Sequence, residues 1–123
     1  MPILDIEIVQ TDGAPPPDAA LTQALAAAAG RALATQPGRT WVRLRTLPAA
    51  QYAENEYALA PDELPVFASL LHAHPPEGTA LADEVAALTQ ALAACIGRDA
   101  RHVHVQYTPA AAGRQAFGGV LVI

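Results

Sequence analysis

Alternating apolar and polar side chains predict most of the strands of this chain. Leu4, Ile6 and Ile8 alternate with two acidic residues, which is the period-two pattern of a strand that has one face in the core. One later segment is apolar without interruption and also has the length of a strand. The predicted strands are residues 1–9, 40–47, 65–71 and 101–108, with a short closing strand at 117–122.

Two alanine-rich segments carry leucines at the spacing of a helix that is buried on one face. The first covers residues 18–35, with Asp18 as its predicted N-cap. The second covers residues 79–96, with Thr79 as the cap and Gly97 at the position after the last turn.

The same unit occurs twice along the chain. Leu21–Ala27 recurs as Leu88–Ala94, and Val42–Ala50 is matched more loosely by Val103–Ala111. An alanine-rich helix can match by accident. A helix and a strand that match in the same order, in units that each open with proline, point to a duplication.

We therefore expect a single domain, 1–123, made of two β-α-β units, 1–57 and 58–123. Each unit joins two parallel strands by a right-handed helical crossover, and together they predict an α+β fold. This fold has a four-stranded sheet, both helices on one face, and a short closing strand. The other face would then carry a polar set, in which acids meet arginines across strands: Asp5, Glu7, Trp41, Arg43, Arg45, His102, His104 and Gln106. A partner subunit that covers this face and a solvated face on a monomer are both compatible with the pattern.

Composition excludes several classes of function. The net charge of -5 and the absence of basic runs argue against nucleic acid and anionic membranes as partners. All seven basic residues are arginines, which favours recognition of carboxylates. The single cysteine, Cys95, excludes an internal disulfide and is expected to be a small core residue. No apolar run long enough to span a membrane and no leader were identified, so a cytoplasmic protein is the expectation.

Pro2 is the residue with the most distinctive chemistry. If Met1 is removed, as a small second residue favours, the chain begins with a secondary amine that can act as a base or a nucleophile. Every internal proline nitrogen is an amide and lacks this chemistry. Because the chain has no lysine, amine chemistry has only the N-terminus available.

A chain that opens Met-Pro on a strand and is built from two β-α-β units resembles the tautomerase superfamily. This superfamily includes 4-oxalocrotonate tautomerase and macrophage migration inhibitory factor. Two further points carry the resemblance: Pro65 opens the second unit, and Gly113–Gly119 looks like the glycine-rich hairpin that closes a tautomerase unit. The resemblance implies a homotrimer around a central barrel, sites at subunit boundaries, and a small carboxylic acid as substrate.

The resemblance assigns roles to several residues. Pro2 matches the catalytic proline, and Phe117 matches the hydrophobic wall of the site. Arg43 and His104 stand at the strand position of a substrate-binding arginine, and Arg39 lies near a lysine of the migration-factor branch. The substrate is left open, because the segment after the first strand lacks the arginine that the short tautomerases carry there.

Three functions remain open. A neutral Pro2 would act as general base in a keto–enol tautomerisation of a 2-oxo or unsaturated acid. A cationic Pro2 would act as general acid in a hydratase, dehalogenase or decarboxylase, with Glu54 and Asn55 beside Tyr52 as candidates to activate water. A trimeric scaffold without catalysis would show the same strands; an enzyme should lose activity but keep its trimer when Arg43 or Arg114 becomes alanine.

The histidines are arranged in two pairs. His72 and His74, and likewise His102 and His104, place two imidazoles on one side of an extended segment. No third ligand is indicated, so we expect no metal. No phosphate loop, nucleophile elbow or dinucleotide fingerprint occurs either, so we expect no cofactor.

Overall fold

The computed structural model describes residues 2–123, and the expectation that Met1 is removed concerns a residue outside this range. Strands and helices follow one another in the order β1 (Ile3–Gln10), α1 (Ala19–Ala32), β2 (Trp41–Pro48), β3 (Val66–Leu71), α2 (Gly78–Ile96), β4 (Val103–Tyr107), β5 (Ala116–Phe117) and β6 (Val120–Leu121).

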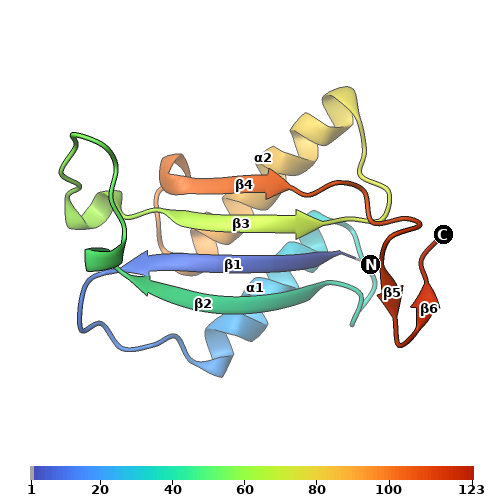
Figure 1. Ribbon diagram of the computed structural model, residues 1–123, viewed down its shortest axis with the longest axis horizontal. Helices are drawn as coiled ribbons and strands as arrows, with labels where there is room; N and C mark the ends of the chain where they lie inside the picture. Colours follow the sequence, from blue (N-terminus) through green and yellow to red (C-terminus); the bar gives the residue numbers. More distant parts are fainter. Residues whose placement is uncertain (1) are drawn as a thin grey trace.

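The main sheet has the strand order β2-β1-β3-β4. Strands β1 and β2 are parallel, β3 and β4 are parallel, and the two pairs meet where β1 runs antiparallel to β3. Both helices cover one face of this sheet (Figure 1). The predicted α+β fold, with a four-stranded sheet and two helices on one face, is confirmed.

The closing segment differs from its prediction. In place of one strand at 117–122, β5 and β6 form a separate two-stranded hairpin. Gly118 and Gly119 form its turn with φ angles of 57° and 88°, a backbone conformation that other residues rarely adopt.

Two element starts also differ. The second helix begins at Gly78 after Glu77, without a side-chain cap, so Thr79 lies inside it. The last long strand begins only at Val103, because residues 100–102 form a 3-10 turn in which the backbone amide of Arg101 donates to the side chain of Asp99. His102 therefore lies in this turn, and its placement on the strand was wrong.

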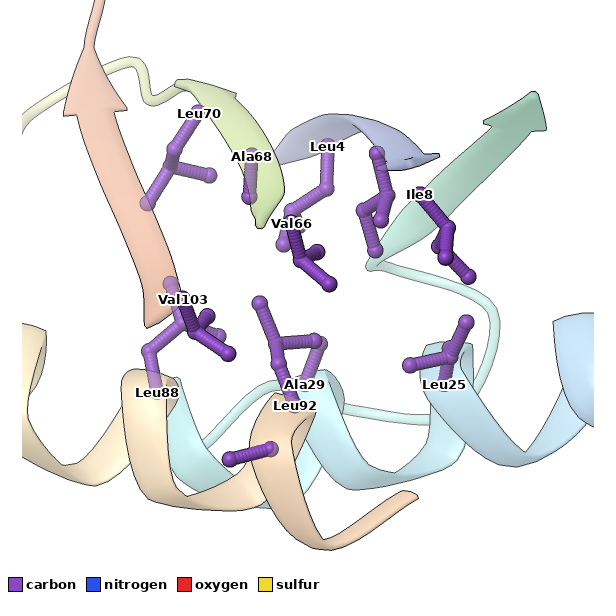
Figure 2. Packing of buried hydrophobic residues seen from close by; sticks show 12 residues of the cluster. Leu4, Ile8, Leu25, Ala29, Val66, Ala68, Leu70, Leu88, Leu92 and Val103 are labelled. Carbon is purple, nitrogen blue, oxygen red and sulfur yellow. The ribbon is translucent and has the colours of Figure 1, made fainter. Parts of the chain in front are cut away.

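The core lies between the sheet and the helices. Figure 2 shows apolar side chains of β1 and β3 packed onto those of the two helices. The residues with no exposed surface include Leu4, Val9, Leu25, Val66, Leu70, Leu88 and Leu92. Alternation in β1 and helical spacing in α1 and α2 thus direct the predicted residues into one core.

Helix α2 corrects one expectation. By length and composition alone it is long and apolar enough to cross a membrane, which the sequence reading had excluded. In the fold its leucines, Leu88 and Leu92, pack into the core.

The opening prolines of the two predicted units do not occupy equivalent positions in the sheet. The repeat equates Val42 with Val103, and the strand registers pair these two residues with Leu4 and Val66. Pro65 therefore stands one position further along its strand than the opening proline of the first unit.

Candidate active site

The sheet face opposite the helices carries two rows of side chains that cross all four strands. The first row is Arg43, Asp5, Ser69 and Gln106, and the second is Arg45, Glu7, Phe67 and His104. The acids of β1 pair with the arginines of β2, at 2.6 Å for Asp5 and Arg43 and at 3.5 Å for Glu7 and Arg45. The predicted pairing of acids with arginines on this face is confirmed.

Arg43 is held by two hydrogen bonds. Its Nε and one terminal nitrogen donate to the two oxygens of Asp5, at 2.6 and 2.8 Å. These bonds, together with the charge of Asp5, raise the pKa of Arg43. The guanidinium thus stays charged and is paired with Asp5, although its side chain is 72% exposed.

The second half of this face has aromatic contacts where the first half has ion pairs. Phe67 and His104, which pair across β3 and β4, have ring centroids 5.5 Å apart. Tyr52 packs on the same Phe67 at 5.8 Å. The open face is therefore charged over β1 and β2 and less polar over β3 and β4.

Pro2 lies at the corner where β1 begins, and it is buried. Its carbonyl accepts a hydrogen bond of 3.0 Å from the backbone amide of Trp41, the first residue of β2. The ring of Trp41 meets Phe117 of β5 edge to face, with centroids 5.1 Å apart. The start of β1, the start of β2 and the terminal hairpin thus converge on Pro2, and the hairpin lies beside this end of the sheet in Figure 1.

Two arginines lie in the segments that form this corner. Arg39 precedes Trp41 by two residues, and Arg114 precedes Phe117 by three. Both side chains are exposed, and neither forms an ion pair within residues 2–123. Both are therefore available to an anion, unlike Arg43.

The remaining predicted residues lie at the opposite end of the sheet. Tyr52 and Asn55 belong to the loop between β2 and β3, drawn at the left of Figure 1. Tyr52 donates a 2.7 Å hydrogen bond to Glu54 Oε2, and burial together with this bond raises the pKa of Tyr52 to about 12. Within one chain, this loop and His104 are separated from Pro2 by the length of the strands.

The structure reveals a polar cluster that the sequence reading missed. His72, which directly follows β3, places Nε2 3.9 Å from Glu84 Oε1 of α2, and Tyr107 of β4 donates a short hydrogen bond to the other oxygen of Glu84. Burial is the main cause that lowers the pKa of His72, and Glu84 opposes it. Burial also raises the pKa of Tyr107. His72, Glu84 and Tyr107 lie far apart in the chain. The sequence could have indicated this cluster only through polar residues at half-buried positions of a strand end, a helix and a strand.

The predicted histidine pairs do not act as pairs. His72 faces Glu84, whereas His74 Nε2 lies 3.0 Å from the carbonyl oxygen of Ile123. His102 is in the turn before β4, and His104 stacks on Phe67. Within residues 2–123 no group of three metal-ligating side chains is found.

Sequence comparison gives no relatives: no protein-family model and no curated protein matches this chain. Solved structures do match. A fused 4-OT symmetric trimer has a TM-score of 0.72 at 20% identity, over 98% of this chain and 94% of that one. Pt0534, inactivated by 2-oxo-3-pentynoate, has a TM-score of 0.71 at 17% identity, over 97% and 94%. FG41 malonate semialdehyde decarboxylase, inhibited by 3-bromopropiolate, has a TM-score of 0.62 at 16% identity, over 94% and 90%.

These likenesses extend over almost the whole chain and over both β-α-β units. Their identities are low, so what they establish is the architecture. The chain has the fold of the tautomerase superfamily, and the resemblance predicted from its sequence is confirmed at the level of the fold.

Proposed function

We propose that this chain is a tautomerase-like enzyme that uses the amine of Pro2 as a general base on small 2-oxo, enol or unsaturated carboxylic acids. The observation that carries this proposal is the corner at the start of β1, where buried Pro2 lies beside the Trp41–Phe117 aromatic pair. The likeness to Pt0534, whose inactivator is a 2-oxo acid, supports the substrate class.

The chemistry begins with a neutral amine. Burial of the Pro2 amine would disfavour its ammonium form and so favour the neutral base. The lone pair then takes a proton from carbon or from an enol hydroxyl, the bonding electrons move through the enolate system, and Pro2 returns the proton to another atom of it. In an assembly that covers this corner, the rings of Trp41 and Phe117 would keep water away from this exchange.

The substrate carboxylate needs a cation near Pro2. Arg39 and Arg114 lie in the segments that form the Pro2 corner and are without acidic partners in residues 2–123, so we assign carboxylate binding to them first. Arg43 takes part only if the substrate displaces Asp5 from it.

We further propose a homotrimer with sites at its subunit boundaries. Solvated ion pairs and an exposed Trp41 lie on the sheet face away from the helices, and the fused 4-OT structures are trimers. In such an assembly, His104, Tyr52 and Asn55 of one subunit would complete the site at the Pro2 of its neighbour. Within one chain these residues lie too far from Pro2 to contact the same substrate, and the trimer would remove this distance.

The test is ketonisation of phenylenolpyruvate by purified protein whose intact mass shows that Met1 is absent. Pro2→Ala keeps a terminal amine but loses the secondary amine, and loss of a general base lowers the rate about 10²–10⁴-fold. Pro65→Ala is the matched control, because this proline nitrogen is an amide, and it should retain activity. Equal rates for wild type and Pro2→Ala would reject the proposal and favour a non-catalytic trimer.

A second candidate is a hydratase, dehalogenase or decarboxylase in which a cationic Pro2 is the acid. The carboxylate of Glu84 favours it, because this group lies with His72 at the end of the sheet where β1 begins. Malonate semialdehyde decarboxylase has the same fold. Release of carbon dioxide from malonate semialdehyde, without ketonisation of phenylenolpyruvate, would select this candidate.

A further inference from the structure

His72 and Pro2 are neighbours across the β1–β3 pair. The last pair in this antiparallel register is Ile3 with Leu71, so the next residue outwards on each strand is Pro2 on one side and His72 on the other. Facing residues in such a pair have Cα atoms about 4.5–5.5 Å apart.

Both side chains point to the helical side of the sheet. Side chains alternate along a strand, and Leu4 and Leu70, two positions inwards, are fully buried under the helices. The burial of Pro2 and the contact of His72 with Glu84 of α2 agree with this direction.

The imidazole of His72 has one nitrogen without a partner. Within residues 2–123, Nδ1 is the buried side-chain atom for which no hydrogen bond is found. The other nitrogen, Nε2, faces the carboxylate of Glu84 at 3.9 Å, an ion-pair separation that favours a hydrogen on Nε2. In the neutral ring, Nδ1 then carries a lone pair and needs a donor.

Pro2 can supply this donor only after processing. While Met1 is attached, the nitrogen of Pro2 is a tertiary amide and has no hydrogen to give. Once Met1 is removed, the nitrogen becomes an amine with one hydrogen when neutral and two when protonated.

We propose that His72 Nδ1 accepts a hydrogen bond from the amine of Pro2, so that these two groups share a single proton. When Pro2 is in its ammonium form, one of its two protons can move to Nδ1, which leaves a neutral amine, and the resulting imidazolium then donates from Nε2 to Glu84. Tyr107 holds Glu84 in place from β4. His72 acts on a substrate only through Pro2, and it is a positioning residue.

The pair titrates as one unit. Two positive charges side by side in a buried site repel, so the second proton binds only at low pH. Burial is the main cause that lowers the pKa of His72; among the described residues, the charge of Glu84 of α2 opposes this shift and His74 of the same loop adds to it. The inference rests on the free amine of the proposed function, but it does not need turnover.

The experiment is a direct titration of Pro2. In processed protein labelled with ¹⁵N-proline, the terminal nitrogen is the one proline nitrogen that can change with pH, since the others are amides. Replacing His72 by Phe removes the acceptor, and loss of one charge-assisted hydrogen bond should lower the pKa of Pro2 by about one unit, or tenfold in dissociation constant. Glu84→Gln, which keeps an acceptor for Tyr107, should lower it in the same direction by less.

His102→Phe is the matched control, because it removes an imidazole from the turn before β4, at the end of the sheet opposite Pro2, and it should leave the titration unchanged. An unchanged pKa of Pro2 in folded His72→Phe, or in Glu84→Gln if the first variant does not fold, overturns the inference. If the pKa falls in both variants but no ketonisation occurs, the pairing holds and the proposed function fails. If ketonisation occurs and the pKa does not move, the proposed function holds and the pairing fails.

Discussion

Arg98 ties together the two halves of the sheet, which makes its replacement an informative test of the fold. One terminal nitrogen of its guanidinium donates to the carbonyl of Leu64 at 2.6 Å, and the other donates to that of Val9 at 2.8 Å. Val9 ends the buried part of β1, and Leu64 precedes β3. The cation therefore bridges the two central antiparallel strands at the end of the sheet opposite Pro2, and its partial burial lowers its pKa.

Replacing Arg98 by Met keeps the apolar stem and removes both donors. A hydrogen bond to a charged group contributes about 1.5–3 kcal/mol when it is buried, and water that reaches this half-buried site replaces part of it. We therefore expect a loss of about 2–3 kcal/mol in the free energy of unfolding. For a chain of this length, that loss corresponds to a fall in Tm of roughly 8–12 °C.

The assay is urea unfolding at one fixed protein concentration, because an oligomer gains stability with concentration. Arg31→Met is the matched control: Gly30-Arg31 is the counterpart of Gly97-Arg98 in the first repeat, but Arg31 is exposed and has no side-chain hydrogen bond within residues 2–123. It should change stability by less than about 0.5 kcal/mol. Equal and small losses for both variants, with an unchanged urea dependence, would refute the view that Arg98 joins the two strands.

Three further predictions concern the sheet face and the Pro2 corner. Asp5→Asn should free Arg43 and lower the KM for a carboxylate substrate several-fold, at a stability cost under about 1 kcal/mol; an unchanged KM would show that Arg43 does not contact substrate. A double-mutant cycle of Trp41→Leu and Phe117→Leu in urea should give a coupling of about 0.5–1.5 kcal/mol, and additive losses would contradict the edge-to-face contact. Burial lowers the pKa of His72 below its ordinary 6.5, so just below that pH the unfolded chain binds more protons than the folded one. The free energy of unfolding should therefore fall as pH falls from 6.5 towards the folded pKa of His72, and it should stay level above pH 6.5. His72→Gln should flatten this part of the profile, and a stability profile identical to wild type would contradict the assignment.

Local patterns were sufficient to predict the fold, because the position of each strand or helix depends mainly on which of its faces is apolar. Alternation of Leu4, Ile6 and Ile8 directs these residues inwards, and the structure leaves them 0–4% exposed. The repeat supplied the topology, since two β-α-β units leave few ways to form one sheet. The prediction for the closing segment was wrong, because Gly118 and Gly119 have positive φ angles and turn the chain where the apolar composition indicated a continuous strand.

The site was predicted less completely, because its residues are brought together by pairing between strands. Pro2 and Phe117 were named from the sequence and lie at the same corner, with Trp41 between them. Nothing in the sequence indicated that Arg43 would be engaged by Asp5, beyond the general expectation of acid–arginine pairs. His72 was considered only as half of a metal pair, because the register that places it beside Pro2 is a property of the sheet.

Duplication gives this sheet two similar corners, but only one of them can hold a free amine. At the first corner, Pro2 becomes the chain end if Met1 is removed. At the second, the repeat places Leu64 in the equivalent position, where it is 6% exposed and its carbonyl is bonded by Arg98. A residue in the middle of the chain has an amide nitrogen and no free amine, so the contact with Arg98 makes this second corner structural.

The two halves of the open sheet face also differ in their side chains. Ion pairs lie over the strands of the first unit, and the Phe67–His104 contact lies over those of the second. In an assembly where the Pro2 corner of each subunit meets the second unit of its neighbour, the aromatic and imidazole groups of that second unit would complete the amine site. Neither unit alone contains both the amine and these groups.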